Sequence, residues 1–128
     1  YGEFRMPVGD GWVDNQSAGG VSSVVDLASG SLGAANSSKV WWGPLRTNPV
    51  TGKEIVGFTL PLWQEALALG CRAHDTLSEF AFIGWDIALL AEGPLLIEAN
   101  SLWDTPAPYQ VGQTLFPECV LAHLQERA

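Results

Sequence analysis

The chain has 128 residues and a formal net charge of −8, with 47% hydrophobic and 16% charged residues. This balance predicts a globular domain rather than a disordered segment, and the shortage of Lys and Arg argues against a nucleic-acid partner. No apolar run approaches membrane-spanning length and no signal peptide is visible, so we expect no membrane partner either.

The N-terminal half of the sequence predicts short strands separated by turns. In chain order, we expect a strand at 1–8, a short return strand at 12–14, a hairpin of strands at 21–27 and 32–36, and a short strand at 55–58. Between these strands, NQSAGG at 15–20 reads as a small-residue loop and TNPVTG as turns. These features predict an antiparallel sheet.

A helix is predicted from Pro61 to about Thr76, because proline suits the first turn of a helix. Apolar residues recur there at helical spacing, at Leu62, Ala66, Leu69, Ala73 and Leu77. Gly70 weakens this prediction, since glycine costs about 1 kcal/mol in a helix relative to alanine. A last helix is expected at 117–126. The fold class is therefore α+β: a mostly antiparallel sheet with one long packed helix and a C-terminal helix, in a single domain at 1–128.

Two apolar runs in GWDIALLAEGPLLIEAN predict another hairpin, at 84–90 and 94–99, joined by a three-residue loop that ends in glycine. If Leu90 faces Pro94, pairing continues through Ala88 with Leu96 to Asp86 with Glu98. Side chains alternate along a strand, so Asp86, Glu98 and Asn100 share one face. The other face then carries the apolar residues Ile87, Leu89, Leu95, Ile97 and Ala99.

Carboxylates directly opposite each other repel, and a half-buried pair must share a proton or hold a cation. Asp86, Glu98 and Asn100 offer the oxygen ligands that Mg²⁺ or Mn²⁺ prefers. The alternative is that Asp86 caps a turn, Glu98 points to solvent and Asn100 merely ends the strand.

The segments FRM, VDNQSAGGV, NPVTGKEIVGFTLPLWQEAL and especially IGWDIALLAEGPLLIEAN resemble the C-terminal catalytic portion of ATP-grasp proteins, in the sugar-transfer-associated, α-L-glutamate-ligase-like group. The resemblance covers about residues 2–113. It implies an ATP- and Mg²⁺-dependent ligase that joins a carboxylate to an amine through an acylphosphate. The same resemblance implies that Asp86, Glu98 and Asn100 hold one or two Mg²⁺ ions between the β- and γ-phosphates of ATP.

Two further parts of the site are implied by the same resemblance. Arg5 matches a family arginine near the transferred phosphate or acyl group, and Asn15 with Gly19 and Gly20 matches a loop at the substrate end of the site. Each has an alternative: Arg5 could form a loose surface ion pair with Glu3 or Asp26, and the loop could be an ordinary turn.

The match also has departures. Lys39 and Lys53 are the only lysines, and neither lies in a recognisable nucleotide-binding segment. Asn48 stands where this group suggests a histidine before the proline. We therefore expect a partial ATP-grasp domain that lacks the N-terminal nucleotide-binding subdomain and is inactive as an isolated chain. The alternative is a non-catalytic metal-binding or protein-interaction module that keeps the fold.

The expected cofactors are ATP and Mg²⁺ or Mn²⁺, and the expected partners are a carboxylate substrate and either a second copy of the chain or the missing subdomain. Open strand edges and apolar patches would favour such association. Cys71 and Cys119 are expected to be reduced thiols in a cytoplasmic protein.

Overall fold

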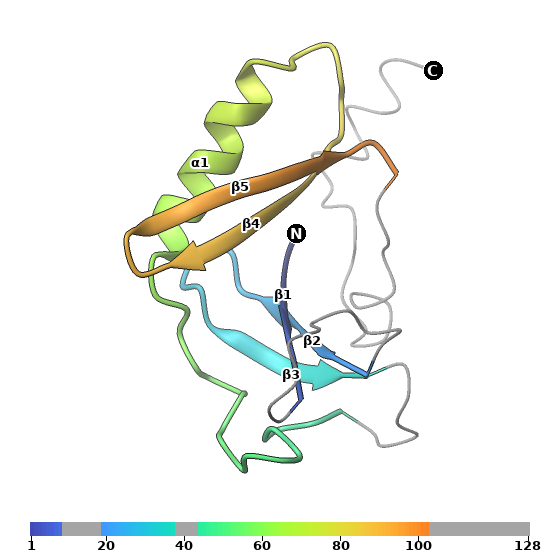
Figure 1. Ribbon diagram of the computed structural model, residues 1–128, viewed down its shortest axis with the longest axis vertical. Helices are drawn as coiled ribbons and strands as arrows, with labels where there is room; N and C mark the ends of the chain where they lie inside the picture. The colour runs from blue at the N-terminus through green and yellow to red at the C-terminus, as the bar shows by residue number, and fades with distance from the viewer. Residues whose placement is uncertain (9–18, 38–43, 103–128) are drawn as a thin grey trace.

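A computed structural model of the protein describes residues 1–8, 19–37 and 44–102. Within these ranges the chain forms two small antiparallel sheets and one helix (Figure 1). The elements are β1 (Gly2–Met6), β2 (Val21–Val25), β3 (Leu32–Asn36), α1 (Trp63–Asp75), β4 (Gly84–Leu90) and β5 (Gly93–Asn100). The α+β class is confirmed, but the strands divide between a β1-β2-β3 sheet and a β4-β5 hairpin instead of forming the single sheet expected.

Three of the expected elements differ from this arrangement or lie beyond it. The strand predicted at 12–14 and the helix predicted at 117–126 fall outside the described residues. The strand predicted at 55–58 is wrong, because a turn follows Ile55: the Phe58 N–H donates to the Ile55 carbonyl at 3.0 Å, and Gly57 has a φ of 82°. In the described part of the chain, no helix has the length and apolarity needed to cross a membrane.

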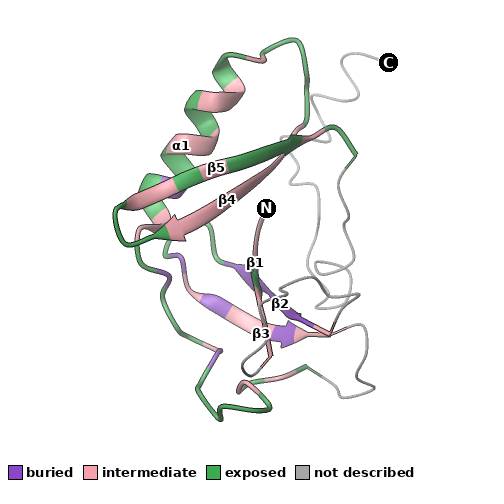
Figure 2. Cartoon of the chain, in the orientation of Figure 1, coloured by how far each residue is buried: buried purple, intermediate pink, exposed green. Residues whose placement is uncertain are grey.

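The core lies on one face of the β1-β2-β3 sheet. Val21 pairs with Met6, and Val25 pairs with Gly2 and with Leu32, so these residues share that face. Val21, Val25 and Leu32 pack with three further residues into one cluster of buried side chains: Ala35, Ile55 and Leu60. Figure 2 shows buried residues along β2 and at both ends of β3, as expected for a central strand and its neighbour.

Trp63 attaches α1 to this sheet. Its ring packs against the core cluster, and its indole N–H donates a hydrogen bond to the Leu27 carbonyl at 2.9 Å. The positions predicted at helical spacing are buried or half-buried in the structure, with Ala66 at 4% exposure. The helix begins later than expected, because Leu62 takes a left-handed conformation with a φ of 58° and forms the N-cap.

Further along its length, α1 supports the β4-β5 hairpin, which lies across the helix in Figure 1. The Trp85 and His74 rings form a T-shaped contact, with centroids 6.4 Å apart and planes at 79°. Ile87 lies above Gly70 of the helix. The helix therefore joins the hairpin to the three-stranded sheet.

Gly70→Ala is expected to raise the free energy of unfolding by up to about 1 kcal/mol, because alanine is the better helix former. The added Cβ would lie 3.5 Å from Ile87 Cδ1 and 3.9 Å from Trp85 Cδ1, which is ordinary van der Waals contact. Urea denaturation followed by circular dichroism measures the change, with Ala68→Gly on the exposed side of α1 as the reverse control. A loss of stability in Gly70→Ala would mean that the hairpin cannot accommodate the methyl group.

Candidate active site between β1 and the hairpin

Asp86 and Glu98 lie directly opposite each other in the hairpin, as the sequence predicted. The pairing nearer the turn differs by one residue: Leu90 faces Gly93 and Ala88 faces Leu95, so the predicted pairs with Pro94 and Leu96 are wrong. The loop is shorter than expected, and a bulge between the two halves of the hairpin restores the register, with Ile97 as the extra residue of β5. Two offsetting irregularities therefore leave the acidic pair in place.

The bulge changes which side chains share the acidic face. Directly opposite residues lie on the same face, so Leu95 accompanies Ala88 and Asp86 instead of Ile87. Leu95 is 51% exposed and Ile97 is 59% exposed. Trp85 and Ile87 pack on α1, which leaves the acidic face directed away from the helix.

Arg5 reaches this acidic face from the other sheet. Its Nη2 lies 3.1 Å from Asp86 Oδ1, in an ion pair whose side chains are 41% and 34% exposed. The alternative partners Glu3 and Asp26 are therefore not those of this ion pair, and two residues predicted for the same site come together from β1 and β4. Nothing in the local sequence pattern indicates this contact, since it depends on how the two sheets pack.

Glu98 and Asn100 complete the group on β5. The Asn100 side-chain amide donates a hydrogen bond to Glu98 Oε1 at 3.1 Å. Two carboxylates and one amide oxygen on neighbouring strands suit a hard cation by their chemistry, and this set fits Mg²⁺ or Mn²⁺. Among the described residues, no three Asp, Glu, His or Cys side chains group to form a metal site, so the amide and water would have to complete the coordination.

The small-residue loop is only partly described. Asn15 lies outside the described residues, whereas Gly19 and Gly20 lead directly into β2. Gly19 has a φ of 105°, which a residue with a side chain rarely adopts. Gly20 is buried next to Val21, which pairs with Met6 of β1.

Asn48 has a structural role in the turn that carries it. Its side-chain oxygen accepts hydrogen bonds from the N–H groups of Val50 and Thr51, both at 3.0 Å. Asparagine side chains commonly stabilise turns in this way. The residue found where a histidine was expected therefore caps a turn.

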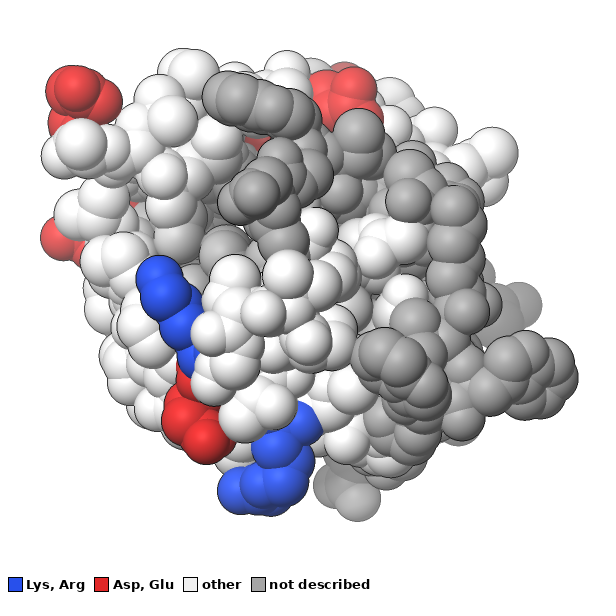
Figure 3. Space-filling view, turned by 60° about the horizontal axis from the view of Figure 1, so that its bottom comes forward, with Lys and Arg blue, Asp and Glu red and all other residues white. Residues whose placement is uncertain are grey.

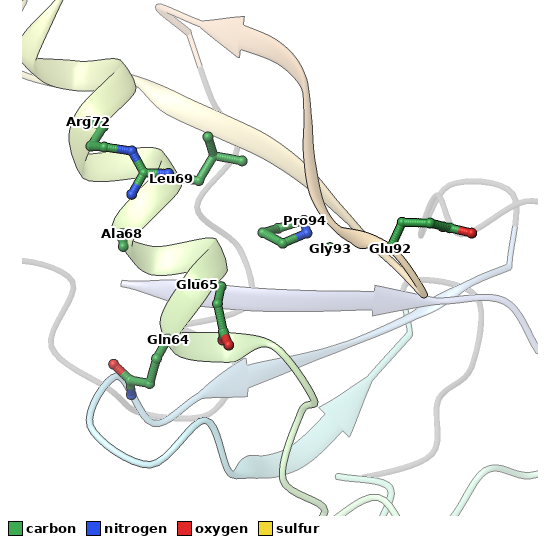
Figure 4. Close-up of a pocket in the computed structure, with 8 residues that line it drawn as sticks. All are labelled: Gln64, Glu65, Ala68, Leu69, Arg72, Glu92, Gly93 and Pro94. Atoms are coloured by element: carbon green, nitrogen blue, oxygen red, sulfur yellow. The ribbon is translucent and has the colours of Figure 1, made fainter.

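A shallow groove with a volume of about 510 Å³ lies on the other side of the hairpin, between α1 and the β4-β5 turn. It is lined by Gln64, Glu65, Ala68, Leu69, Arg72, Glu92, Gly93 and Pro94. Figure 4 shows these residues on the helix and at the turn of the hairpin. None of the predicted site residues lines it, because Asp86 and Glu98 occupy the opposite face of the hairpin.

On the face shown in Figure 3, the described Lys and Arg side chains form separate spots with an acidic side chain between them. They form no continuous basic patch on this face, which agrees with the negative net charge. Among its described side chains, this face therefore lacks the basic patch that attracts a phosphate backbone.

The chain that carries Arg5, Asp86, Glu98 and Asn100 also matches a known family by its sequence. A family model described as sugar-transfer associated ATP-grasp matches residues 3–123. The chain belongs to the sugar-transfer associated ATP-grasp family. Comparison with curated proteins and with solved structures found no match. The ATP-grasp assignment covers both sheets and the helix, including every predicted site residue.

Proposed function

We propose that this chain is the C-terminal catalytic part of an ATP- and Mg²⁺-dependent carboxylate-amine ligase that acts through an acylphosphate. Family membership supports the ATP-dependent ligase class. The observation that carries the site assignment is the 3.1 Å contact between Arg5 and Asp86, beside the Asp86–Glu98 pair. It joins a cationic hydrogen-bond donor to oxygen ligands from different parts of the chain.

Each of these side chains has a role that follows from its chemistry. Asp86, Glu98 and Asn100 would hold Mg²⁺, which would supply positive charge to offset that of a nucleotide's phosphates. Arg5 presents a planar guanidinium, whose N–H groups suit a phosphoryl or carboxylate group in a bidentate arrangement. Gly19, with its positive φ, lets the backbone approach an anion closely.

The chain offers few other cations for a nucleotide. Lys39 and Lys53 are its only lysines, and Lys53 is exposed in the turn that Asn48 caps. A site for three phosphates would then depend on Mg²⁺ and Arg5, so the isolated chain is expected to be inactive. We propose that an N-terminal subdomain with the phosphate-binding lysines completes the ligase.

The surface around the site fits a partial domain. Leu90, Leu95, Ile97 and Leu102 are between 44% and 94% exposed on and next to the hairpin. A hairpin with several strongly exposed apolar side chains commonly meets a partner surface. A closed surface would instead have favoured a self-contained binding module.

Titration calorimetry with Mg²⁺ or Mn²⁺, with and without ATP, tests this function. We expect the chain to bind the cation, ATP to tighten the binding because its phosphates add ligands, and Glu98→Ala to abolish it. Glu92→Ala is the matched control, since it removes an exposed glutamate from the turn of the same hairpin.

Equal binding by Glu98→Ala and Glu92→Ala would contradict the site assignment. No heat with any variant would rule out the cation site, and the chain would then be a non-catalytic interaction module that retains the ATP-grasp fold.

A further inference from the structure

The Asp86 carboxylate has two binding partners to consider. It is a ligand in the proposed cation site, and it is also the partner of Arg5 at 3.1 Å. Arg5 holds Asp86 Oδ1, so a cation that takes this oxygen, or both oxygens of the carboxylate, has to displace the guanidinium. We propose that Arg5 and the divalent cation compete for Asp86, so that Arg5 leaves the carboxylate when the cation binds and becomes available to an anionic substrate group. This inference rests on the function proposed above.

The reason for the ion pair lies in the hairpin itself. Asp86 and Glu98 face each other, and like charges directly opposite destabilise a sheet. In the cation-free chain, Arg5 offsets the charge of Asp86, and the Asn100 amide donates to Glu98. Arg5 and Asn100 thus reduce the repulsion that a bound cation would otherwise relieve.

The exposure of the pair makes the exchange feasible. Arg5 and Asp86 are 41% and 34% exposed, and an ion pair this open to water is weak. A divalent cation that engages both carboxylates gains two attractions, whereas the 3.1 Å contact of Arg5 is with Asp86. Arg5 also lies on β1, at the edge of its sheet, where its side chain can turn without disturbing the buried strand β2.

The exchange couples the cation to the substrate. Arg5 becomes available only after the cation has neutralised the acidic pair, and an anion held by Arg5 would in turn favour the cation-bound state, because such coupling is reciprocal. The chain would then present its guanidinium to the transferred group only when the metal site is filled.

The first test is Mn²⁺ titration of the intact chain, of Arg5→Gln and of Arg46→Gln, followed by calorimetry. Arg5→Gln removes the group that competes with Mn²⁺ for Asp86. We expect it to tighten Mn²⁺ binding by about two- to fivefold, which is the affinity ratio that corresponds to the free energy of an exposed ion pair. Arg46→Gln removes the same charge from an exposed position on the segment between β3 and α1 and is expected to leave the affinity unchanged.

The second test separates competition from simple repulsion between Arg5 and the cation. Phenylglyoxal modifies accessible guanidinium groups, and peptide mass spectrometry measures the rate at each arginine. We expect Mn²⁺ to accelerate modification of Arg5 severalfold while the rates at Arg46 and Arg72, both exposed, stay constant. In Asp86→Asn, Mn²⁺ is expected to leave the rate at Arg5 unchanged.

The outcomes distinguish this inference from the proposed function. If Mn²⁺ binds and depends on Glu98 but leaves the reactivity of Arg5 unchanged or lower, the competition is overturned and the cation site stands. A tighter Arg5→Gln variant without a change in Arg5 reactivity overturns it too, since repulsion alone explains that result. Absence of Mn²⁺ binding in every variant overturns both.

Discussion

Gly30→Ala is expected to lower the free energy of unfolding by about 3 kcal/mol, which combines overpacking with backbone strain. Gly30 has a φ of 74°, and an added Cβ would lie 2.7 Å from Trp63 Cγ and 2.8 Å from its Cβ and Cδ1. The residue is buried, and its carbonyl accepts a hydrogen bond from the Leu60 N–H at 3.0 Å, so the backbone has little freedom to move away. Urea denaturation followed by circular dichroism measures the loss.

Gly52→Ala is the matched control for this substitution. Gly52 has a similar φ of 69°, but no atom lies within 4 Å of the position of an added Cβ. We expect a cost of about 1 kcal/mol there, from the backbone conformation alone. The difference of about 2 kcal/mol would measure the close approach of Trp63 to the β2-β3 turn. Equal losses at the two glycines would show that Trp63 can shift without cost.

Trp63→Ala is expected to lower the free energy of unfolding by about 3 kcal/mol, at the low end for a tryptophan because the ring is only half-buried. The substitution removes the packing of the ring on the core cluster and the hydrogen bond from its N–H to the Leu27 carbonyl. Because α1 also supports the hairpin, the loss would weaken the attachment between the two sheets that bring Arg5 to Asp86. Chemical denaturation monitored by circular dichroism tests this expectation.

Gln64→Ala controls for the loss of a contact with the same turn. Gln64 is the next residue of α1, is exposed, and donates its side-chain amide to the Ala28 carbonyl at 2.9 Å. Its removal is expected to cost about 0.5 kcal/mol or less, since water replaces an exposed hydrogen bond. Comparable losses for Trp63→Ala and Gln64→Ala would contradict the view that the tryptophan ring attaches the helix to the sheet.

Predictions from local sequence patterns were correct where the pattern restricted the backbone to one kind of secondary structure. The α1 prediction held because the helical spacing of Ala66, Leu69 and Ala73 matches the face that the protein buries. The strand predicted at 55–58 was wrong. Ile55 is buried in the core, but the chain turns two residues later, at Gly57. Apolar character identified a buried residue there but did not distinguish a strand from a turn.

At the candidate site, the prediction of the acidic hairpin was likewise correct in part and wrong in part. The opposition of Asp86 and Glu98 was predicted correctly, although the loop length assumed for it was wrong. The bulge at Ile97 compensated for the shorter loop, and no local signal in the sequence indicates it. The prediction that Leu95 shares a face with Ile87 failed for that reason.

The amino-acid sequence by itself determined the α+β class, the main helix, the two described hairpins and the residues of the family's motif, because each depends on periodicity or on neighbouring residues. Only the tertiary structure decided that the strands form two sheets, and that Arg5 of one sheet pairs with Asp86 of the other. That contact depends on the packing of Trp63 against the core cluster and of Trp85 and Ile87 further along α1. Such long-range packing is a property of the folded chain, which no short segment encodes.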